Sequence, residues 1–276
     1  MAEAMVLLKR WLVAALIALM SPGLAWSADL QVVSQGPVPA AGGQRFVVHS
    51  QRIGRDFVVD VDGPAPSAGR KTPAIYALDG GYGVAIPEAA MLAWTGAMQP
   101  ALVVTVAATG DVGNLRLVDM LYAPATIAGK ATGGGGEAFE AFLLEELRPF
   151  IEARFSADPD RAILFGHSVG GLFAANLLAR KPQAFNGYLI ASPSVWVDPA
   201  VVERVKAAAG APDKQRVFVA VGGGEEPVML QGAAQLAGAL APGFLVQAMA
   251  YAGEGHLTYY PLLVANAFPW LLPPVK

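Results

Sequence analysis

Residues 161–180, RAILFGHSVGGLFAANLLAR, constrain the fold more than any other part of the sequence. The apolar run at 162–165 is typical of a buried strand, and residues 169–180 have the pattern of a helix. Between them lies Gly-His-Ser-Val-Gly, whose glycines let a strand and a helix pass too close together for side chains. The alternative is an ordinary glycine-rich turn, since 31 glycines make chance matches easy. The strand before and the helix after favour a sharp turn that exposes the hydroxyl of Ser168.

The other predicted elements alternate between strands and helices. An antiparallel hairpin is predicted at 44–51 and 55–62, where apolar and polar residues alternate. Further strands are predicted at 74–78, 101–107, 188–191, 216–221 and 244–250, and helices at 87–95, 137–155, 198–209, 228–240 and 257–272. This order predicts an α/β fold in one domain, 28–276: a mostly parallel central sheet with an N-terminal antiparallel hairpin and helices on both faces.

Prolines, glycines and polar residues mark the predicted boundaries. Residues 28–43 are expected to form an extended lead-in, and residues 108–136 a long irregular segment of the kind that is usually functional or mobile. Pro149 is expected to kink or end the helix that contains it. Asp198 is expected to cap the helix at 198–209, with Pro199 behind it, and the last helix is expected to be interrupted by Pro261 and Pro269.

The first 27 residues have the pattern of a secretion signal. Two basic residues precede an apolar run at 11–20, a Pro-Gly pair breaks the run, and Ala25 and Ser27 supply small residues before a cleavage site at Ala28. A membrane anchor is the alternative, but the apolar run is short for a span. The pattern predicts a signal peptide at 1–27, a periplasmic or secreted protein, and no stable membrane span after cleavage.

Composition and motif searches argue against several classes of function. The formal net charge of −3 argues against a nucleic-acid partner. The absence of cysteine excludes disulfides, thiolate metal sites and a cysteine nucleophile. No histidine pair has metal-ligand spacing, and the sequence contains no phosphate-binding loop and no Gly-x-Gly-x-x-Gly after a strand. We therefore expect no metal and no cofactor.

A serine hydroxyl needs a base before it can attack at neutral pH, and the chain has three histidines. His49 lies on the N-terminal hairpin, at the wrong end of the chain. His167 is adjacent to Ser168 and is expected to face another direction. His256 directly follows the last predicted strand, at the edge of the sheet where Ser168 is also expected. Elimination leaves His256 as the base, with a solvated loop histidine as the alternative.

The remaining catalytic groups are expected at the same edge. The strand at 216–221 runs into Gly-Gly-Gly-Glu-Glu, so either Glu225 or Glu226 could orient the histidine, and the other would be a solvated charge. A tetrahedral intermediate needs donors for its oxyanion. We expect one from the N–H of Val169 and the second from Gly81, in the glycine-rich loop after the strand at 74–78. Asp79 is expected to brace that loop.

Motifs spread over most of the chain carry a resemblance to a known family. They are Tyr-Ala-Leu-Asp-Gly-Gly at 76–81, Arg116 with Asp119, the runs at 134–139, 147–152 and 166–171, Ala-Ser-Pro-Ser-Val-Trp at 191–196, the run at 221–225, and His256. These segments resemble the esterase D-like branch of the α/β-hydrolases, which includes the enterobactin and salmochelin trilactone esterases and is related to the mycolyltransferases.

The resemblance implies an α/β-hydrolase fold and assigns roles to matching residues. Ser168 matches the nucleophile, His256 the base, and Gly81 and Val169 the oxyanion donors. Glu225 stands where the family has the glutamate of its Val-Gly-x-x-Glu motif, which favours it over Glu226, although some trilactone esterases use a Ser–His dyad.

The implied activity is that of an exported serine esterase that hydrolyses a small-molecule carboxylic ester through an acyl-enzyme, with a siderophore trilactone as first candidate. The alternatives are a general aryl, feruloyl or acyl-sugar carboxylesterase, an acyltransferase, and a non-catalytic ligand-binding protein on the same fold. The segment around Arg116 is shorter here than in the trilactone esterases. Arg116 is expected either to bind an anionic or catecholate substrate or to pair with Asp119, and Tyr82 and Trp196 either to line an aromatic pocket or to pack.

Overall fold

The computed structural model describes residues 30–38, 43–67, 69–208 and 215–275, with the side chain of Tyr82 left out. The predicted signal peptide at 1–27 lies outside these residues. Within the described ranges, every helix is too short or too polar to cross a membrane.

One large sheet forms the centre of the molecule. In the described part of the chain it has nine strands in the order β1-β2-β3-β5-β4-β8-β9-β10-β11. The strands are β1 Leu30–Pro37, β2 Gln44–Ser50, β3 Arg55–Asp62, β4 Thr72–Leu78, β5 Leu102–Ala108, β8 Ala157–His167, β9 Gly187–Ala191, β10 Arg216–Gly222 and β11 Leu245–Tyr251. Strands β1 to β3 are antiparallel and β3 pairs antiparallel with β5, whereas all pairs from β5 to β11 are parallel. The predicted mostly parallel sheet with an antiparallel N-terminal part is confirmed.

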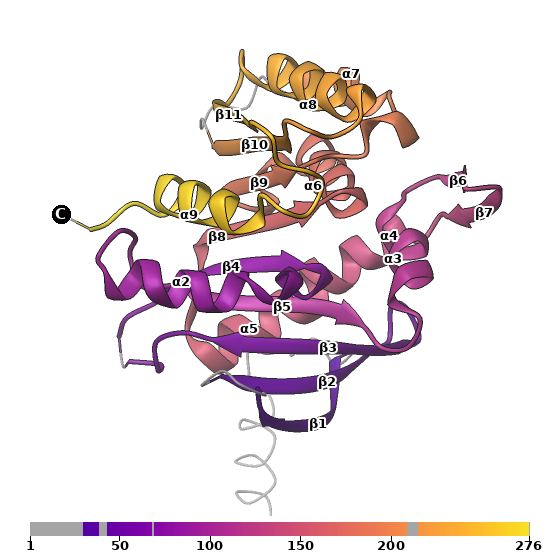
Figure 1. Ribbon diagram of the computed structural model, residues 1–276. Coiled ribbons are helices and arrows are strands. Elements are labelled where there is room, and N and C mark those ends of the chain that lie inside the picture. The colour runs from indigo at the N-terminus through magenta and orange to yellow at the C-terminus, as the bar shows by residue number, and fades with distance from the viewer. Residues whose placement is uncertain (1–29, 39–42, 68, 209–214, 276) are drawn as a thin grey trace, which may run out of the picture.

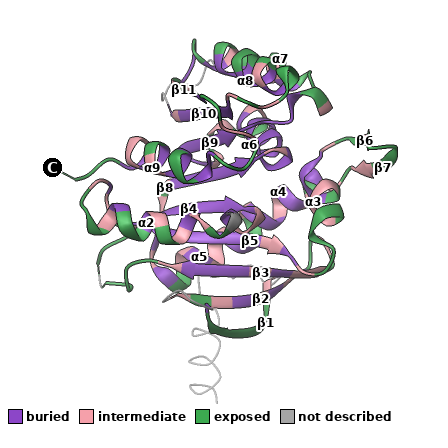
Figure 2. Ribbon diagram, viewed as in Figure 1, coloured by how far each residue is buried: buried purple, intermediate pink, exposed green. Residues whose placement is uncertain are grey.

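Helices cover both faces of the sheet, as Figure 1 shows. One face packs against α2 Ala85–Trp94 and α9 Tyr260–Leu271. The other packs against α4 Gly136–Ala141, α5 Arg148–Phe155, α6 Val169–Arg180, α7 Val201–Ala208 and α8 Pro227–Leu240. Because both faces are covered, β4 and β9 are apolar and buried almost throughout, whereas the edge strand β1 is exposed (Figure 2).

The strand order has a topological switch point between β4 and β8. Strands β4 and β8 are parallel neighbours, with Ala77 opposite Phe165 near their carboxyl ends. The chain leaves β4 toward α2 on one face and leaves β8 toward α6 on the other. Ligands of open α/β sheets bind at such switch points, outside the carboxyl ends of the strands. The loop after β4 and the turn after β8 therefore meet at the place where a site is expected.

Two segments in which no strand or helix was predicted contain regular structure. Residues 28–43 were expected as an extended lead-in, but 30–37 form β1, which pairs with β2. Its side chains are almost all exposed, so no apolar alternation marks it. Residues 108–136 contain α3 Val112–Met120 and the hairpin of β6 Pro124–Ile127 and β7 Lys130–Gly133. The Asp111 carboxylate accepts a hydrogen bond from the Asn114 N–H, so an N-cap signal for α3 was present.

The helix predicted at 137–155 is divided by a π-helical turn, Phe142–Leu147, between α4 and α5. Pro149 lies in the first turn of α5, just after this turn, where its missing N–H is accommodated. The expected Asp198 cap is wrong, because α7 begins at Val201 and the Asp198 carboxylate pairs with Arg204. Pro261 opens α9 rather than interrupting it.

Candidate active site

Ser168 lies at the sharp turn between β8 and α6. Its φ of 59° and ψ of −118° are a strained conformation for a residue with a side chain. Its N–H donates to the Ala191 carbonyl at 2.9 Å, which fixes the turn to the neighbouring strand β9. A Cβ on Gly166 would lie 2.0 Å from the Gly170 carbonyl oxygen, so only glycine fits where strand and helix cross. The predicted strand–turn–helix is present, and Ser168 is half-buried within it.

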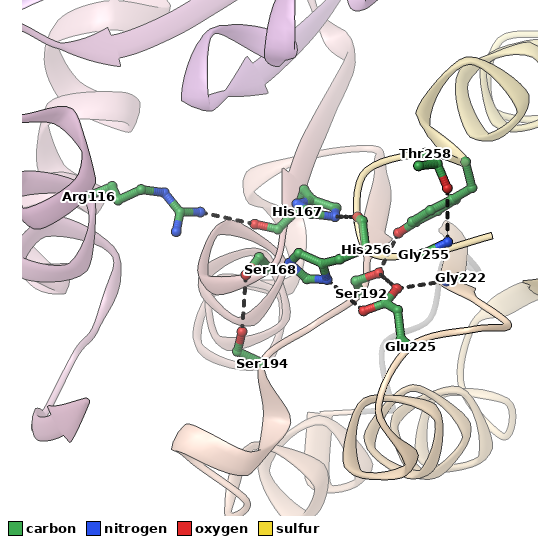
Figure 3. A network of polar contacts seen from close by, with 11 residues as sticks. Arg116, His167, Ser168, Ser192, Ser194, Gly222, Glu225, Gly255, His256 and Thr258 are labelled. Atoms are coloured by element: carbon green, nitrogen blue, oxygen red, sulfur yellow. Dashed lines mark hydrogen bonds and ion pairs between the residues drawn. The ribbon is translucent and has the colours of Figure 1, made fainter. Parts of the chain in front are cut away.

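His256 and Glu225 form a close pair beside this turn. The distance from His256 Nδ1 to Glu225 Oε2 is 2.6 Å. Because a carboxylate only accepts, Nδ1 carries the proton, and Nε2 has a lone pair that can accept one. Figure 3 shows the His256 ring between Glu225 and Ser168. The histidine side chain is 42% exposed, whereas that of the glutamate is 2% exposed.

Glu225 is held by two more hydrogen bonds. Its Oε1 accepts from Ser192 Oγ at 2.5 Å and from the Gly222 N–H at 2.8 Å. Burial opposes ionisation of this carboxyl, but the hydrogen bonds from His256, Ser192 and Gly222 outweigh it and lower the pKa of Glu225. The carboxylate is therefore charged at neutral pH. Glu226, the other candidate, is exposed at the N-cap position of α8, so the structure brings Glu225 rather than Glu226 to His256.

His167 contacts the backbone of His256. Its Nε2 lies 2.8 Å from the backbone carbonyl oxygen of His256, to which it must donate, and the two rings are 4.5 Å apart. Burial lowers the pKa of His167 to about 3, so its imidazole is neutral. His167 thus fixes the backbone of His256 and takes no proton at neutral pH.

The third histidine, His49, lies away from this pair. It is on the β2–β3 hairpin, with its Nδ1 2.7 Å from Asp56.

The loop after β4 forms the other side of the site. In this turn, Asp79–Gly83, the φ angles of Asp79, Gly80 and Gly81 are 56°, 67° and 58°. A Cβ on Gly170 would lie 3.2 Å from Asp79 Oδ2, so the loop packs against the first turn of α6. Val169 is the first residue of α6, where backbone N–H groups have no partner within the helix. The two predicted oxyanion donors, Gly81 and Val169, therefore lie on neighbouring segments.

Arg116, on α3, is bound to this loop. Its Nε and Nη2 donate to the two Asp79 carboxylate oxygens at 2.8 and 2.7 Å. Asp119, the predicted ion-pair partner of Arg116, pairs with Arg55 instead. The predicted Arg116–Asp119 pair is therefore wrong: the two residues lie one turn apart on α3, close enough to pair, but each side chain pairs with a residue of another segment, Asp79 or Arg55. The predicted bracing of the loop by Asp79 has a structural basis in the pair with Arg116.

Sequence reasoning missed three hydroxyl groups near the nucleophile. Ser194 Oγ lies 3.3 Å from Ser168 Oγ. Ser192 Oγ lies 2.6 Å from Tyr259 Oη. The two hydroxyls therefore form a hydrogen-bonded chain that ends at Glu225 Oε1. Both serines belong to the Ser-Pro-Ser motif, which marked the segment without assigning roles. Trp196, in the short helix Val195–Val197, is 47% exposed, and the side chain of Tyr82 lies outside the described part of the structure.

Among the described residues there is no cluster of three or more side chains of the types that ligate metals. The groups that lie together at this edge of the sheet are the Ser168 hydroxyl, the His256 imidazole and the Glu225 carboxylate.

Residues 50–261 match the model of the family Esterase, described as "Putative esterase". The chain belongs to this esterase family. It is 33% identical to the ferri-bacillibactin esterase BesA of Bacillus subtilis over 153 residues, which are 51% of this chain and 53% of BesA. It is 29% identical to the siderophore triacetylfusarinine C esterase of Aspergillus fumigatus over 173 residues, which are 58% of each chain.

A solved structure has a comparable architecture. The crystal structure of the BES protein from Bacillus cereus has a TM-score of 0.75 and 26% sequence identity, and the match covers 88% of this chain and 99% of that one. The chain spans just over half the length of the two curated relatives named above, 53% and 58%. The expected α/β-hydrolase fold is confirmed.

Proposed function

We propose that this protein is a serine esterase that hydrolyses carboxylic esters through an acyl-enzyme. The observation that carries the proposal is the strained Ser168 beside the 2.6 Å pair of His256 and Glu225, at the carboxyl edge of the sheet. Membership of the esterase family and the names of the two relatives support it.

The first half-reaction acylates Ser168. His256 Nε2 takes the hydroxyl proton as Ser168 Oγ attacks the ester carbonyl carbon, and Glu225 stabilises the imidazolium. The N–H groups of Gly81 and Val169 donate to the oxygen that becomes negative. When the tetrahedral intermediate collapses, His256 gives the proton to the alkoxide oxygen, and the alcohol leaves.

The second half-reaction releases the acid. A water molecule loses a proton to His256 and attacks the acyl carbonyl, and the proton then returns to Ser168 Oγ as the acid departs. The side chain of His256 is 42% exposed and Ser168 is half-buried, so water reaches the site. This access favours hydrolysis over acyl transfer, which requires that water be excluded.

The first candidate substrate is a siderophore ester. The support is that two relatives are named for siderophore esters, ferri-bacillibactin and triacetylfusarinine C. Aryl, feruloyl and acyl-sugar esters are the alternative. A panel that compares ferric trilactones with feruloyl and acetyl esters separates them by kcat/KM. A siderophore esterase should prefer the trilactone by at least about tenfold, and a flat profile would favour a general carboxylesterase.

Export is a separate part of the proposal, supported by the pattern of residues 1–27. Expression of the full chain in a bacterial host, followed by fractionation and N-terminal sequencing, tests it. The expected mature N-terminus is Ala28 in the periplasm or medium. An uncleaved cytoplasmic chain would contradict export without affecting the catalytic proposal.

A short-chain p-nitrophenyl ester tests the catalytic proposal. The mature protein should hydrolyse it, and Ser168→Ala should lower kcat by at least about 10³-fold. Turnover that persists undiminished in the variant would refute the mechanism. A lack of turnover together with a lack of labelling by a fluorophosphonate probe would favour a non-catalytic binding protein.

A further inference from the structure

Helix α3 carries two ion pairs that lead to different parts of the molecule. Arg116 reaches Asp79 in the loop after β4, and Asp119, one turn later, reaches Arg55 on β3. The side chains of Arg116 and Asp79 are 17% and 5% exposed, and those of Arg55 and Asp119 are 22% and 4% exposed. The two pairs are similar in chemistry and burial, but only the first touches the candidate active site.

The Arg116 guanidinium joins two catalytic segments at once. Nε and Nη2 bind both oxygens of Asp79, and Nη2 also donates to the His167 carbonyl at 3.3 Å. Figure 3 shows the contact with His167, which immediately precedes Ser168. Together with the pair to Asp79, this contact joins the loop to the nucleophile turn. Two-point pairing of this kind fixes direction as well as distance.

The loop needs such a brace because of its backbone. Asp79 has a φ of 56°, which is unfavourable for a residue with a side chain, and two flexible glycines with positive φ follow it. Conformations of this kind persist only where the surrounding structure fixes them. The donor expected from this loop is the N–H of Gly81, which has no side chain to hold it. Its position therefore depends on how Asp79 is held.

The charge of Asp79 gives a second reason. Its Oδ2 lies against the first turn of α6, close to Gly170, beside the second expected donor, Val169. A buried carboxylate without a partner would oppose the negative charge that forms on the substrate oxygen. The guanidinium neutralises it.

We propose that Arg116 is a positioning residue for the oxyanion-binding loop, which it holds against the nucleophile turn through Asp79 and the His167 carbonyl. The proposal rests on the proposed esterase function, since it assigns Arg116 to the same reaction. It is an alternative to the expectation that Arg116 binds an anionic or catecholate substrate.

The test compares two variants, each of which breaks one of the two ion pairs of α3. Arg116→Gln breaks the pair with Asp79, and Arg55→Gln breaks the pair with Asp119. With p-nitrophenyl acetate, a neutral substrate, Arg116→Gln should lower kcat roughly 10- to 100-fold with KM within about threefold. Arg55→Gln should keep kcat within about threefold of the wild-type value, even if both variants lower Tm by the same amount. Arg116→Lys keeps the charge but loses the two-point geometry, so its kcat should be intermediate.

Two further readouts separate loop positioning from general stability. The inhibition constant of phenylboronic acid, whose adduct on serine is tetrahedral and negatively charged, should rise by the same factor by which kcat/KM falls. Asp79→Asn tolerates the left-handed backbone and removes the charge, so the double variant with Arg116→Gln should be no slower than Arg116→Gln alone. Asp79→Asn and Arg116→Lys carry the test if Arg116→Gln fails to fold.

The proposal is overturned if Arg116→Gln keeps the wild-type kcat, if Arg55→Gln loses as much, or if the loss lies wholly in KM. Failure of the esterase function would be seen separately, as a wild-type protein without turnover or a Ser168→Ala variant with full turnover.

Discussion

The two sides of Ser168 are built in different ways. The relay side, His256 with Glu225 and Ser192, consists of side chains from the ends of the neighbouring strands β9, β10 and β11, joined by hydrogen bonds of 2.5 and 2.6 Å. The oxyanion side, residues 79–83 with Arg116, consists of backbone with positive φ, held by an ion pair from a helix in a different part of the chain. Side chains at strand ends meet because the sheet brings them together, whereas a backbone donor must be placed by the conformation of its loop.

The largest difference should come from the relay side. Glu225→Gln should lower kcat by about 10²- to 10⁴-fold, because an amide offers no charge to the imidazolium and can stabilise the wrong histidine tautomer. Glu226→Gln removes the same charge one residue away, from an exposed position, and should change kcat less than about twofold. Steady-state kinetics with a p-nitrophenyl ester measure both. The opposite ranking would reassign the acid, and two small effects would indicate that Ser168 and His256 act as a dyad.

A smaller but distinct effect is expected on the oxyanion side. Gly81→Ala places a Cβ 2.8 Å from the Ala85 Cβ in a loop whose φ already disfavours a side chain, so the donor N–H should move. We expect kcat to fall roughly 10- to 100-fold with KM little changed. Gly83→Ala is the matched control, because it has the same backbone strain, with φ of 72°, but its Cβ would meet nothing within 4 Å. Equal losses in kcat for both variants would mean that strain, and not the position of Gly81, determines the rate.

The smallest effect is the change of the free energy of unfolding with pH, and it comes from His167, which contacts His256 on the relay side. His167 has a pKa of about 3 in the folded protein and an ordinary value of 6.5, so between these values the unfolded chain binds more protons. The free energy of unfolding should therefore fall as the pH drops below 6.5, by about 2 kcal/mol between pH 7 and pH 5. Urea denaturation at several pH values measures this slope, and His167→Gln should flatten it. A wild-type protein with the same free energy of unfolding at pH 5 and pH 7 would contradict the lowered pKa of His167.

Glu225 acts in a lower pH window. Its pKa is lowered in the folded protein, so the stability it contributes is present above its ordinary value of 4.5 and is lost as the pH falls through the lowered pKa. Glu225→Gln should therefore leave the slope between pH 5 and pH 7 unchanged, which distinguishes its effect from that of His167.

The relay side could be predicted from the sequence, and the oxyanion side only in part. Ser168 and His256 follow strands of a parallel sheet, so chain order alone brings them to one edge. Strand order does not determine which of two adjacent glutamates after a glycine run reaches the histidine. The choice of Glu225 over Glu226 therefore depended on the Val-Gly-x-x-Glu motif. The buried support from Ser192 and Tyr259 had no periodic signal, since it joins residues 67 positions apart.

The partner of Arg116 lay beyond what the sequence pattern could specify. Its bond to Asp79 spans 37 residues and depends on α3, a short helix in a segment predicted to be irregular. Strand β1 was missed for a related reason, because an exposed edge strand has no buried face to produce alternation. Local periodicity predicted the core elements, whereas contacts between short peripheral elements required the structure.

The central claim is that Ser168 is the nucleophile, and covalent labelling tests it most directly. The mature protein is treated with a fluorophosphonate probe and the modified peptide is identified by mass spectrometry. We expect one label per chain, on Ser168, and none on Ser168→Ala. A label on Ser194, whose hydroxyl lies only 3.3 Å away, or full labelling of Ser168→Ala, would contradict it.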